Sequence, residues 1–186
     1  GFPEAWGGND GDLFMTIIAA QELARCGAGG VLASLLSHTI GCPPIVNVGC
    51  NEIKRKVLPS VLRGEKISAL AITEPSGGSD VANLKTTARR DGDHFVLNGS
   101  KTFITSGIRA DFYTVAVRTG GPGPGGVSLL LVDKGTPGFT QTRLEKMGWL
   151  CSDTATLHFD DCRVPVDNLV GNENQGFKAI MLNFNR

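Results

Sequence analysis

The pattern of apolar and polar residues changes character near residue 67 of the 186-residue chain. Before that point, apolar residues recur three or four positions apart, as they do on one face of an α-helix. Beyond it, apolar and polar residues alternate, and turns rich in glycine, proline or aspartate recur at short intervals, which is typical of antiparallel β-structure. The pattern therefore predicts a helical region followed by a β domain.

The N-terminal region predicts three helices, over residues 12–25, 31–40 and 51–63. Asp10 and Asp12 can cap the first helix, because a carboxylate there accepts hydrogen bonds from free N–H groups. Gly41 and the Pro43-Pro44 pair should stop the second. We expect Pro59 to kink or restart the third helix. Gly64 suits its C-terminal cap, and the packing partners of these helices are expected to lie partly outside this chain.

The β region predicts strands over residues 86–90, 94–98, 112–118, 127–133 and 154–159. The first two flank Asp91-Gly92-Asp93, which indicates a hairpin. Pro165 should end the β region, and an apolar face formed by Phe177, Ile180, Met181 and Phe184 predicts a final helix. The chain stops at Arg186 inside that pattern, so we expect the sequence to be a fragment.

Composition excludes several classes of protein. Lys plus Arg and Asp plus Glu both total 18, so no net charge recruits nucleic acid or an anionic membrane. No apolar run approaches the roughly 20 residues of a membrane span. No secretory signal is visible, but the chain begins with Gly1 and not Met, so the sequence leaves open whether a transit peptide preceded it. The five cysteines lack a CxxC pair, which predicts reduced, mostly buried thiols and neither a disulfide framework nor a metal site.

The first candidate site is the stretch Thr73-Glu74-Pro75-Ser76-Gly77-Gly78-Ser79-Asp80, which follows a short apolar run. Its glycines and hydroxyl side chains leave backbone N–H groups accessible, which suits close approach of a phosphate. The alternative interpretation is a polar turn between two strands.

The second stretch is Asn98-Gly99-Ser100-Lys101-Thr102-Phe103-Ile104-Thr105-Ser106-Gly107, which alone could be an ordinary strand. Together with Leu70-Ala71-Ile72-Thr73-Glu74-Pro75 and Gly78-Ser79-Asp80, it resembles the middle domain of the acyl-CoA dehydrogenases. Further similarity to that family lies at Gly1-Phe2-Pro3-Glu4, Gly7-Gly8, Met147-Gly148, Cys151-Ser152-Asp153-Thr154, Asp161-Cys162-Arg163-Val164-Pro165 and Gly176-Phe177. The resemblance covers essentially the whole chain.

The resemblance implies a multi-domain α+β fold. Residues 1–66 would belong to an N-terminal all-helical domain, residues 67–168 would form a middle antiparallel β-barrel that binds flavin, and residues 169–186 would start a truncated C-terminal helical bundle. It also implies FAD as the cofactor, and a homotetramer or homodimer when the protein has its full length.

By the same resemblance, the residues that bind the cofactor are Leu70, Ile72, Thr73, Gly78, Ser79, Phe103, Ile104 and Thr105. The Thr73 hydroxyl would point at the pyrimidine end of the flavin ring, and Gly78 and Ser79 would contact the pyrophosphate. Fixed donors at the pyrimidine end make physical sense, since the reduced flavin gains negative charge there. Phe103 would pack on the ring, and the Thr105 hydroxyl, next to Ile104, would lie near N5.

Phe103 departs from the tryptophan that many members of the family have at this position. An aromatic face remains for stacking, but the indole N–H is lost. This affects the tuning of the flavin and leaves its binding in place. Ser79 and Thr119 match family positions that contact the thioester arm of the substrate.

The implied reaction is α,β-dehydrogenation of an acyl-CoA thioester to the trans-2-enoyl-CoA, with electrons passed to an electron-transfer flavoprotein. A carboxylate would remove the Cα proton while a hydride leaves Cβ for the flavin. The family's base is a glutamate of the C-terminal domain, so it is expected beyond Arg186, no catalytic residue is assigned in this chain, and the fragment alone is expected to be inactive. Glu74 and Asp80 are expected to hold the loop by hydrogen bonds.

Alternatives stay open. The chain could be a non-catalytic flavin- or acyl-CoA-binding module, or part of an oxygen-using acyl-CoA oxidase or flavin monooxygenase. The bacterial cytoplasm and the mitochondrial matrix both suit reduced cysteines. The sequence does not specify the length or branching of the acyl chain.

Overall fold

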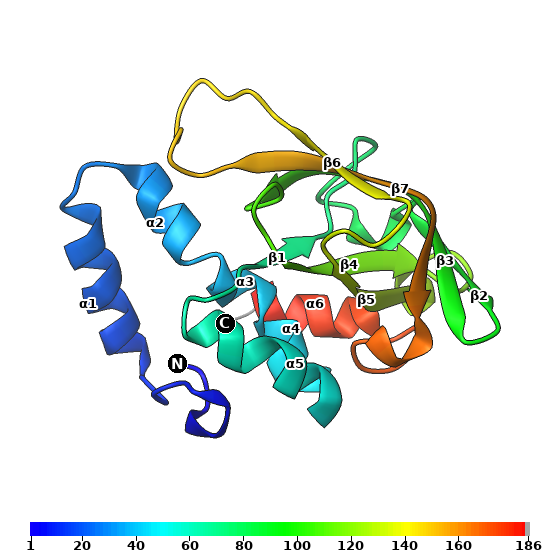
Figure 1. Cartoon of the computed structure of the whole chain (residues 1–186), viewed down its shortest axis with the longest axis horizontal. Coiled ribbons are helices and arrows are strands. Elements are labelled where there is room, and N and C mark those ends of the chain that lie inside the picture. Colours follow the sequence, from blue (N-terminus) through cyan, green and yellow to red (C-terminus); the bar gives the residue numbers. More distant parts are fainter. Residues whose placement is uncertain (185–186) are drawn as a thin grey trace.

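The computed structural model describes residues 1–184, in which a group of helices packs on one side of a curled β-sheet (Figure 1). The helical part holds the short 3₁₀ helix Glu4–Trp6 and five α-helices: α1 (Leu13–Ala24), α2 (Gly29–Leu35), α3 (His38–Gly41), α4 (Pro43–Val48) and α5 (Asn51–Leu62). The α+β fold class predicted from the sequence is confirmed.

Two of the predicted helices differ from the observed ones. The second is divided into α2 and α3, and Pro43 begins α4 where a stop was expected. A proline fits the first turn of a helix because the N–H that it lacks would have no partner there. Helix α5 continues through Pro59 and does not restart at that residue. The predicted cap is present, since Asp12 Oδ1 accepts a hydrogen bond from Met15 N over 2.9 Å.

The strands form one sheet with the order β1-β4-β2-β3-β7-β6, and β5 pairs with β4. Their bounds are β1 (Ser68–Ala71), β2 (Thr87–Asp91), β3 (His94–Thr105), β4 (Phe112–Arg118), β5 (Val127–Asp133), β6 (Phe139–Arg143) and β7 (Thr154–Pro165). The last helix, α6 (Gly176–Phe184), begins close to its predicted start. Strand β6 was not predicted from the sequence.

The sheet is mixed, so the prediction of a purely antiparallel domain is wrong. Strand β1 runs parallel to β4, with Ser68 opposite Phe112 and Ala71 opposite Val115. The intervening residues 72–111 include the β2–β3 hairpin, and a connection of that length lets the chain return beside β1 in the same direction. Local periodicity cannot reveal such a pairing.

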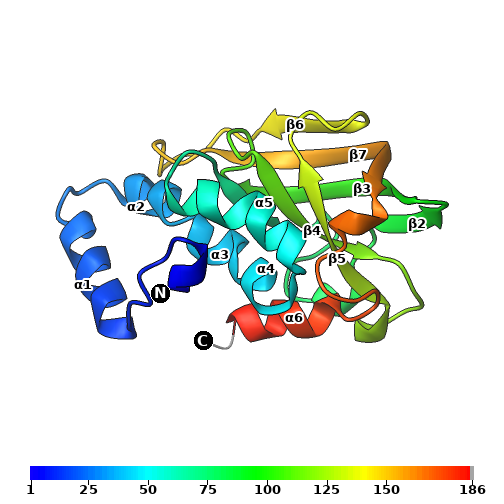
Figure 2. The ribbon, with the colours of Figure 1, turned by 60° about the horizontal axis from the view of Figure 1, so that its bottom comes forward.

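Two apolar cores lie on the two faces of strand β4, and α4, α5 and α6 lie together on one side of the sheet (Figure 2). Tyr113, Val115 and Val117 point into the interior of the curled sheet, where Phe139 and Phe159 also pack. Phe112 and Ala116 face the second core. That core lies against α4, α5 and α6, whose buried residues include Ile45, Val57 and Ile180. The alternation of β4 therefore joins the helices to the sheet.

Helix α1 packs little, and its large apolar side chains are exposed: Leu13, Phe14, Met15, Ile17 and Ile18. Among residues 1–184, no single helix is long and apolar enough to cross a membrane. The pair Gly29–Leu35 and His38–Val48, bent by 44° at the break between them, together reaches that length and composition. The cysteines do not follow the prediction of mostly buried thiols. Cys42 and Cys162 are buried, whereas Cys26, Cys50 and Cys151 are exposed. All five thiols are free.

Candidate functional site

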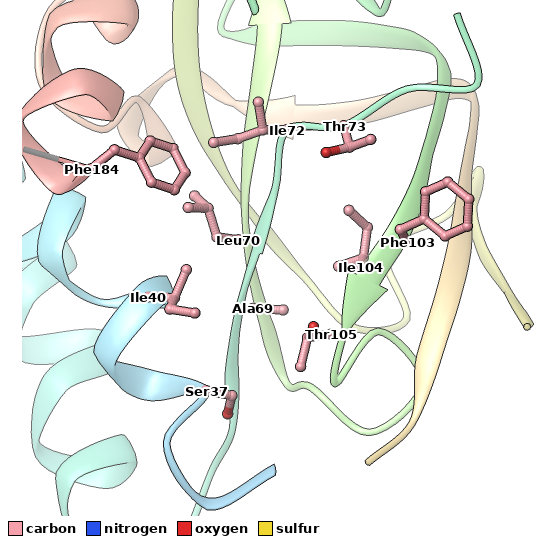
Figure 3. A pocket seen from close by; sticks show the side chains of 10 residues that line it. All are labelled: Ser37, Ile40, Ala69, Leu70, Ile72, Thr73, Phe103, Ile104, Thr105 and Phe184. Carbon is pink, nitrogen blue, oxygen red and sulfur yellow. The ribbon is translucent and has the colours of Figure 1, made fainter. Parts of the chain in front are cut away.

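A pocket lies where β1 and the end of β3 approach α3 and α6 (Figure 3). Its lining consists of Ser37, Ile40, Ala69, Leu70, Ile72, Thr73, Phe103, Ile104, Thr105 and Phe184. Leu70 points towards Ile40 and Phe184, whereas Thr73 and Ile104 lie on the β3 side (Figure 3). The pocket thus has a mainly apolar side, to which Ser37 adds one hydroxyl, and a side that carries the hydroxyls of Thr73 and Thr105.

Six of the eight residues predicted to bind the cofactor come together in this pocket. They are Leu70, Ile72, Thr73, Phe103, Ile104 and Thr105. The two motif stretches that supply them are separated in the sequence by β2 and the first residues of β3. Their convergence on one cavity is therefore a property of the tertiary structure.

Gly78 and Ser79 do not line the pocket, although their loop lies beside it. A Cβ placed on Gly78 would come within 3.1 Å of Thr73 Cγ2, so the backbone at Gly78 packs directly on the Thr73 side chain. Ser79 is exposed. The loop can therefore meet a ligand that extends out of the pocket past Thr73, and glycine is the residue that permits this close packing.

Thr119 also lies outside the pocket, and its hydroxyl group takes part in an internal network. Its Oγ1 lies 2.5 Å from Ser128 Oγ and 2.9 Å from Asn174 Oδ1. Ser128 Oγ in turn accepts a hydrogen bond from Asn174 N over 2.7 Å. These bonds join β4 and β5 to the loop before α6.

A β-bulge in β3 shapes the pocket rim. The pairing of β3 with β7 shifts register between Lys101 and Ile104, and Phe103 within the bulge has a left-handed φ of 57°. Bulges re-aim side chains. Here Phe103 is 70% exposed while Ile104 beside it is buried, so an aromatic side chain is presented at the rim.

The turn after Thr105 is fixed by Asp153, a residue whose positioning role the sequence did not reveal. The buried carboxylate accepts hydrogen bonds from Ile108 N over 2.7 Å and from Arg109 Nε over 2.8 Å, and the Asp153 carbonyl accepts one from Ser106 N. Burial alone would raise the pKa of Asp153, but Arg109 and the backbone N–H groups outweigh it and lower that pKa. The carboxylate is therefore ionised and holds the turn.

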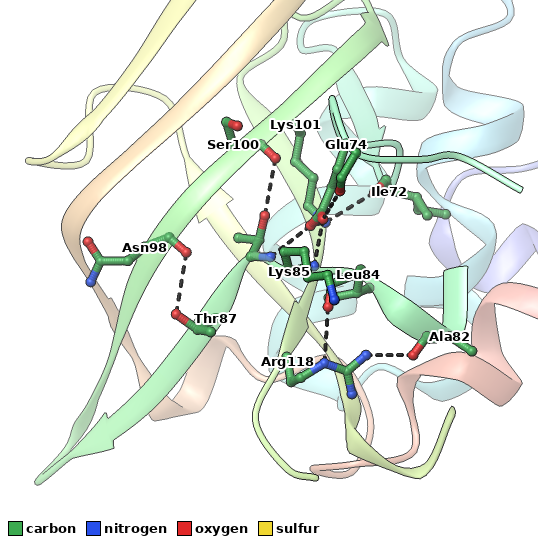
Figure 4. Close-up of polar contacts among 12 residues, drawn as sticks. Ile72, Glu74, Ala82, Leu84, Lys85, Thr87, Asn98, Ser100, Lys101 and Arg118 are labelled. Atoms are coloured by element: carbon green, nitrogen blue, oxygen red, sulfur yellow. Dashed lines mark hydrogen bonds and ion pairs between the residues drawn. The ribbon is translucent and has the colours of Figure 1, made fainter. Parts of the chain in front are cut away.

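Glu74 and Lys101 form an ion pair inside the protein, beside the backbone at Ile72 (Figure 4). Lys101 Nζ lies 2.8 Å from Glu74 Oε1 and donates a second hydrogen bond to the Ile72 carbonyl over 3.1 Å. Burial alone would raise the pKa of Glu74, but the Lys101 ammonium and hydrogen bonds from Lys101, Thr86 and Lys85 lower it to about 2. Burial lowers the pKa of Lys101, and the Glu74 carboxylate limits that fall. Glu74 holds the loop, as predicted, whereas Lys101 was not singled out.

Arg118 holds the far end of the same loop through backbone carbonyl groups (Figure 4). Its guanidinium donates to Leu84 O over 3.0 Å and to Ala82 O over 2.6 Å. It also donates to the carbonyls of Gly121 and Gly123. Asp80, the other predicted loop-holding carboxylate, accepts a hydrogen bond from Asn83 Nδ2 over 2.6 Å.

The lining suits a flat, largely apolar ring with polar edges. Aliphatic side chains form the walls, Phe103 offers an aromatic face, and the hydroxyls of Thr73 and Thr105 can each donate or accept a hydrogen bond. Within the described residues, no carboxylate or histidine lines the cavity. The pocket of residues 1–184 can therefore hold and orient a ring, but its lining offers no proton acceptor of that kind.

Family comparisons match both parts of the chain. The family model of the acyl-CoA dehydrogenase N-terminal domain matches residues 1–65, and that of the acyl-CoA dehydrogenase middle domain matches residues 69–162.

Individual relatives agree. An acyl-CoA dehydrogenase of Emericella nidulans is 47% identical over 178 residues, which are 94% of this chain and 41% of the relative. A crystal structure of a Mycobacterium smegmatis protein assigned as an acyl-CoA dehydrogenase superposes with a TM-score of 0.96 at 55% identity, covering 99% of this chain and 49% of that one. The Bacillus anthracis acyl-CoA dehydrogenase complexed with FAD has a TM-score of 0.91 at 38% identity, over 99% of this chain and 31% of that one.

The chain therefore spans about two fifths of the length of the Emericella relative and half or less of the two solved chains. The resemblance inferred from the sequence motifs is confirmed. By both domain matches and by its whole described fold, this chain belongs to the acyl-CoA dehydrogenase family.

Proposed function

We propose that this chain is the part of an FAD-dependent acyl-CoA dehydrogenase that holds the flavin. The observation that carries the proposal is the convergence of Ile72 and Thr73 with Phe103, Ile104 and Thr105 on one pocket. The FAD complex of the Bacillus anthracis relative supports the choice of cofactor.

The residues fit the cofactor in chemistry as well as in place. The Thr73 hydroxyl and the neighbouring backbone would donate hydrogen bonds to the pyrimidine end of the ring, where reduction places negative charge. Leu70 and Ile72 would exclude water from the ring, and Phe103 would pack on it. Ile104 and the Thr105 hydroxyl would lie at the reactive edge. FAD, when bound, supplies the acceptor for a hydride from the substrate.

The loop beyond Thr73 would hold the rest of the cofactor. Gly78 and Ser79 would meet the pyrophosphate, since the loop packs against Thr73 and both residues are exposed. Ser79 and Thr119 are proposed to contact the thioester arm of the substrate. For Thr119 this requires its hydroxyl to exchange part of its bonding with Ser128 and Asn174.

The reaction proposed for the whole protein is oxidation of an acyl-CoA to the trans-2-enoyl-CoA, with an electron-transfer flavoprotein as acceptor. Within residues 1–184 the pocket lining offers no carboxylate to remove the Cα proton, so the base is proposed to lie on a segment outside this chain. Residues 1–66, 67–168 and 169–186 would belong to three domains of a dimer or tetramer in the bacterial cytoplasm or mitochondrial matrix.

The test is an assay of the complete protein against a panel of acyl-CoAs of different length and branching. We expect bound FAD, bleaching of its visible absorbance by at least one acyl-CoA, and turnover with an artificial acceptor or an electron-transfer flavoprotein. The proposal would be refuted if the purified protein holds no tightly bound FAD and no acyl-CoA bleaches flavin that is added to it. Oxygen consumption during turnover would instead identify an oxidase or monooxygenase.

A non-catalytic binding module is the alternative, and the absence of a carboxylate from the pocket lining of residues 1–184 favours it for the isolated chain. That chain should bind acyl-CoA or flavin without turnover. Reading the gene beyond Arg186 for a helical domain with its glutamate separates the two candidates.

A further inference from the structure

We propose that the buried Lys101–Glu74 ion pair is a positioning device, which holds the ring-facing wall of the pocket and the Gly78–Ser79 loop in one relative arrangement. The inference rests on the proposed FAD site. It assigns a role to two side chains that do not line this pocket and that would act on the ligand through the backbone that they hold.

The burial of the pair is the first observation. The exposed fraction of the side chain is 0% for Lys101 and 3% for Glu74, and within residues 1–184 no other ion pair has both side chains buried. Removing two charges from water is costly, and apolar side chains of similar volume often give equal or greater stability. Stability alone is thus a weak reason for charges at this position.

The contacts of Lys101 supply a better reason. Strand β1 pairs with β4, and the order of the sheet places no ladder between β1 and β3, although the pocket lies between these two strands. Lys101 binds the Ile72 carbonyl and the Glu74 carboxylate, and Thr102 N donates to the Thr73 carbonyl over 2.8 Å. Two consecutive residues of β3 therefore hold three consecutive residues after β1.

The contacts of Glu74 extend this connection to the loop. Its carboxylate accepts hydrogen bonds from Lys85 N over 2.5 Å and from Thr86 N over 2.8 Å. Glu74 thereby joins the two ends of the segment that carries Gly78 and Ser79 (Figure 4). An apolar side chain could fill the same volume, but it could not accept hydrogen bonds from these N–H groups. It also could not pair with Lys101, which binds the Ile72 carbonyl.

The decisive variant is Lys101→Met/Glu74→Gln in the complete, FAD-loaded protein. It removes both charges together, so no lone charge stays buried, and the melting temperature should stay closer to the wild-type value than in Lys101→Met alone. We expect the dissociation constant for FAD to rise by about tenfold or more, because the two pocket walls lose the contacts made through Lys101 and keep only the Thr102–Thr73 backbone hydrogen bond. Wild-type FAD affinity in the double variant would overturn the proposal.

Two controls separate positioning from general destabilisation. Val57→Ala removes buried volume in α5, away from the pocket lining, and should lower the melting temperature without changing FAD affinity. Arg163→Met breaks the half-exposed Arg163–Asp91 pair, which has the same 2.8 Å separation, and should change neither. FAD affinity that simply follows the melting temperature across all these variants would also overturn the proposal.

If the double variant does not fold, Glu74→Asp serves in its place. It keeps the charge but shortens the side chain by one methylene, so the carboxylate cannot reach Lys101, Lys85 N and Thr86 N together. The dissociation constant for FAD should again rise, and an unchanged value would contradict the positioning role.

Hydrogen exchange distinguishes failure of this inference from failure of the proposed function. In FAD-free protein, the amides of Lys85 and Thr86 should be protected in the wild type and should exchange faster in the double variant or in Glu74→Asp. Unchanged protection refutes the positioning device whatever the cofactor is. A wild type that binds no FAD refutes the proposed function and leaves the exchange experiment decisive for the pair.

Discussion

Phe103 combines a strained backbone with an exposed ring. A left-handed φ costs a non-glycine residue about 1 kcal/mol or more, and with 70% of the residue exposed the ring recovers little of that by burial. A residue with this balance is kept for what its side chain can contact.

The variants Phe103→Gly and Phe103→Ala should therefore differ in their free energy of unfolding but should bind FAD with similar affinity. Both remove the aromatic face and should weaken FAD binding, whereas only glycine relieves the strain. We expect the glycine variant to be more stable than the alanine variant by about 1 kcal/mol in urea unfolding of the FAD-free protein. Equal stabilities, or FAD titrations that match wild type, would contradict this account.

Thr105 offers a test of the reactive edge. If its hydroxyl lies near flavin N5, Thr105→Ala should slow reduction of bound flavin by acyl-CoA by about tenfold to a hundredfold, with a smaller loss of FAD affinity. Rapid-mixing absorbance measurements and FAD titration give the two quantities separately. Thr105→Ser keeps the hydroxyl and serves as the control, and an equal loss in both quantities would argue against this placement.

At the scale of elements, the pocket depends on how closely α3 packs on β1. Gly41 is buried at the end of α3, and a Cβ on it would lie 2.8 Å from the Ser68 carbonyl oxygen and 2.9 Å from its carbonyl carbon. Backbone atoms of a central sheet cannot move aside easily. A side chain at residue 41 must therefore push the helix away from the strand.

Gly41→Ala should lower the free energy of unfolding by about 1 to 3 kcal/mol, as overpacking usually does. FAD affinity should fall as well, since Ser37 and Ile40 of the same segment line the pocket. Gly125→Ala is the matched control, because its Cβ would meet nothing within 4 Å. A Gly41→Ala protein as stable as this control would show that the helix can shift freely.

At the scale of the whole molecule, buried carboxylates make stability depend on pH. The pKa of Glu74 is lowered from 4.5 to about 2, so its contribution is complete above about pH 4.5 and is lost as the pH falls towards 2. The unfolded state takes up the proton first over this range, which lowers the free energy of unfolding. Asp153, whose pKa is also lowered, acts in the same direction.

We expect Glu74 to account for up to about 3 kcal/mol of the stability lost between pH 6 and pH 2. Urea unfolding of the FAD-free protein at several pH values measures this loss. Lys101→Met/Glu74→Gln lacks the titrating group and should show a flatter dependence on pH. Identical slopes in the two proteins would show that Glu74 is not ionised and paired as described.

Much of the fold follows from local patterns. The Asp12 cap and the turn between β2 and β3 each depend on neighbouring residues, and the structure confirms both. Strand β6 was missed because Phe139 is its only large apolar residue. The parallel pairing of β1 with β4 was missed because it depends on a return of the chain more than 40 residues later, which local sequence patterns do not encode.

The sequence by itself determined most of the local elements, the balanced charge and, through the motifs at residues 70–80 and 98–107, the family. It also pointed to Thr73, Phe103 and Thr105 as candidates. Only the tertiary structure decided that these residues share one pocket and that Lys101 is buried against Glu74, which lies 27 positions away. A lysine in a strand is ordinarily exposed, and its burial depends on a carboxylate and a carbonyl group that the folded chain brings to it.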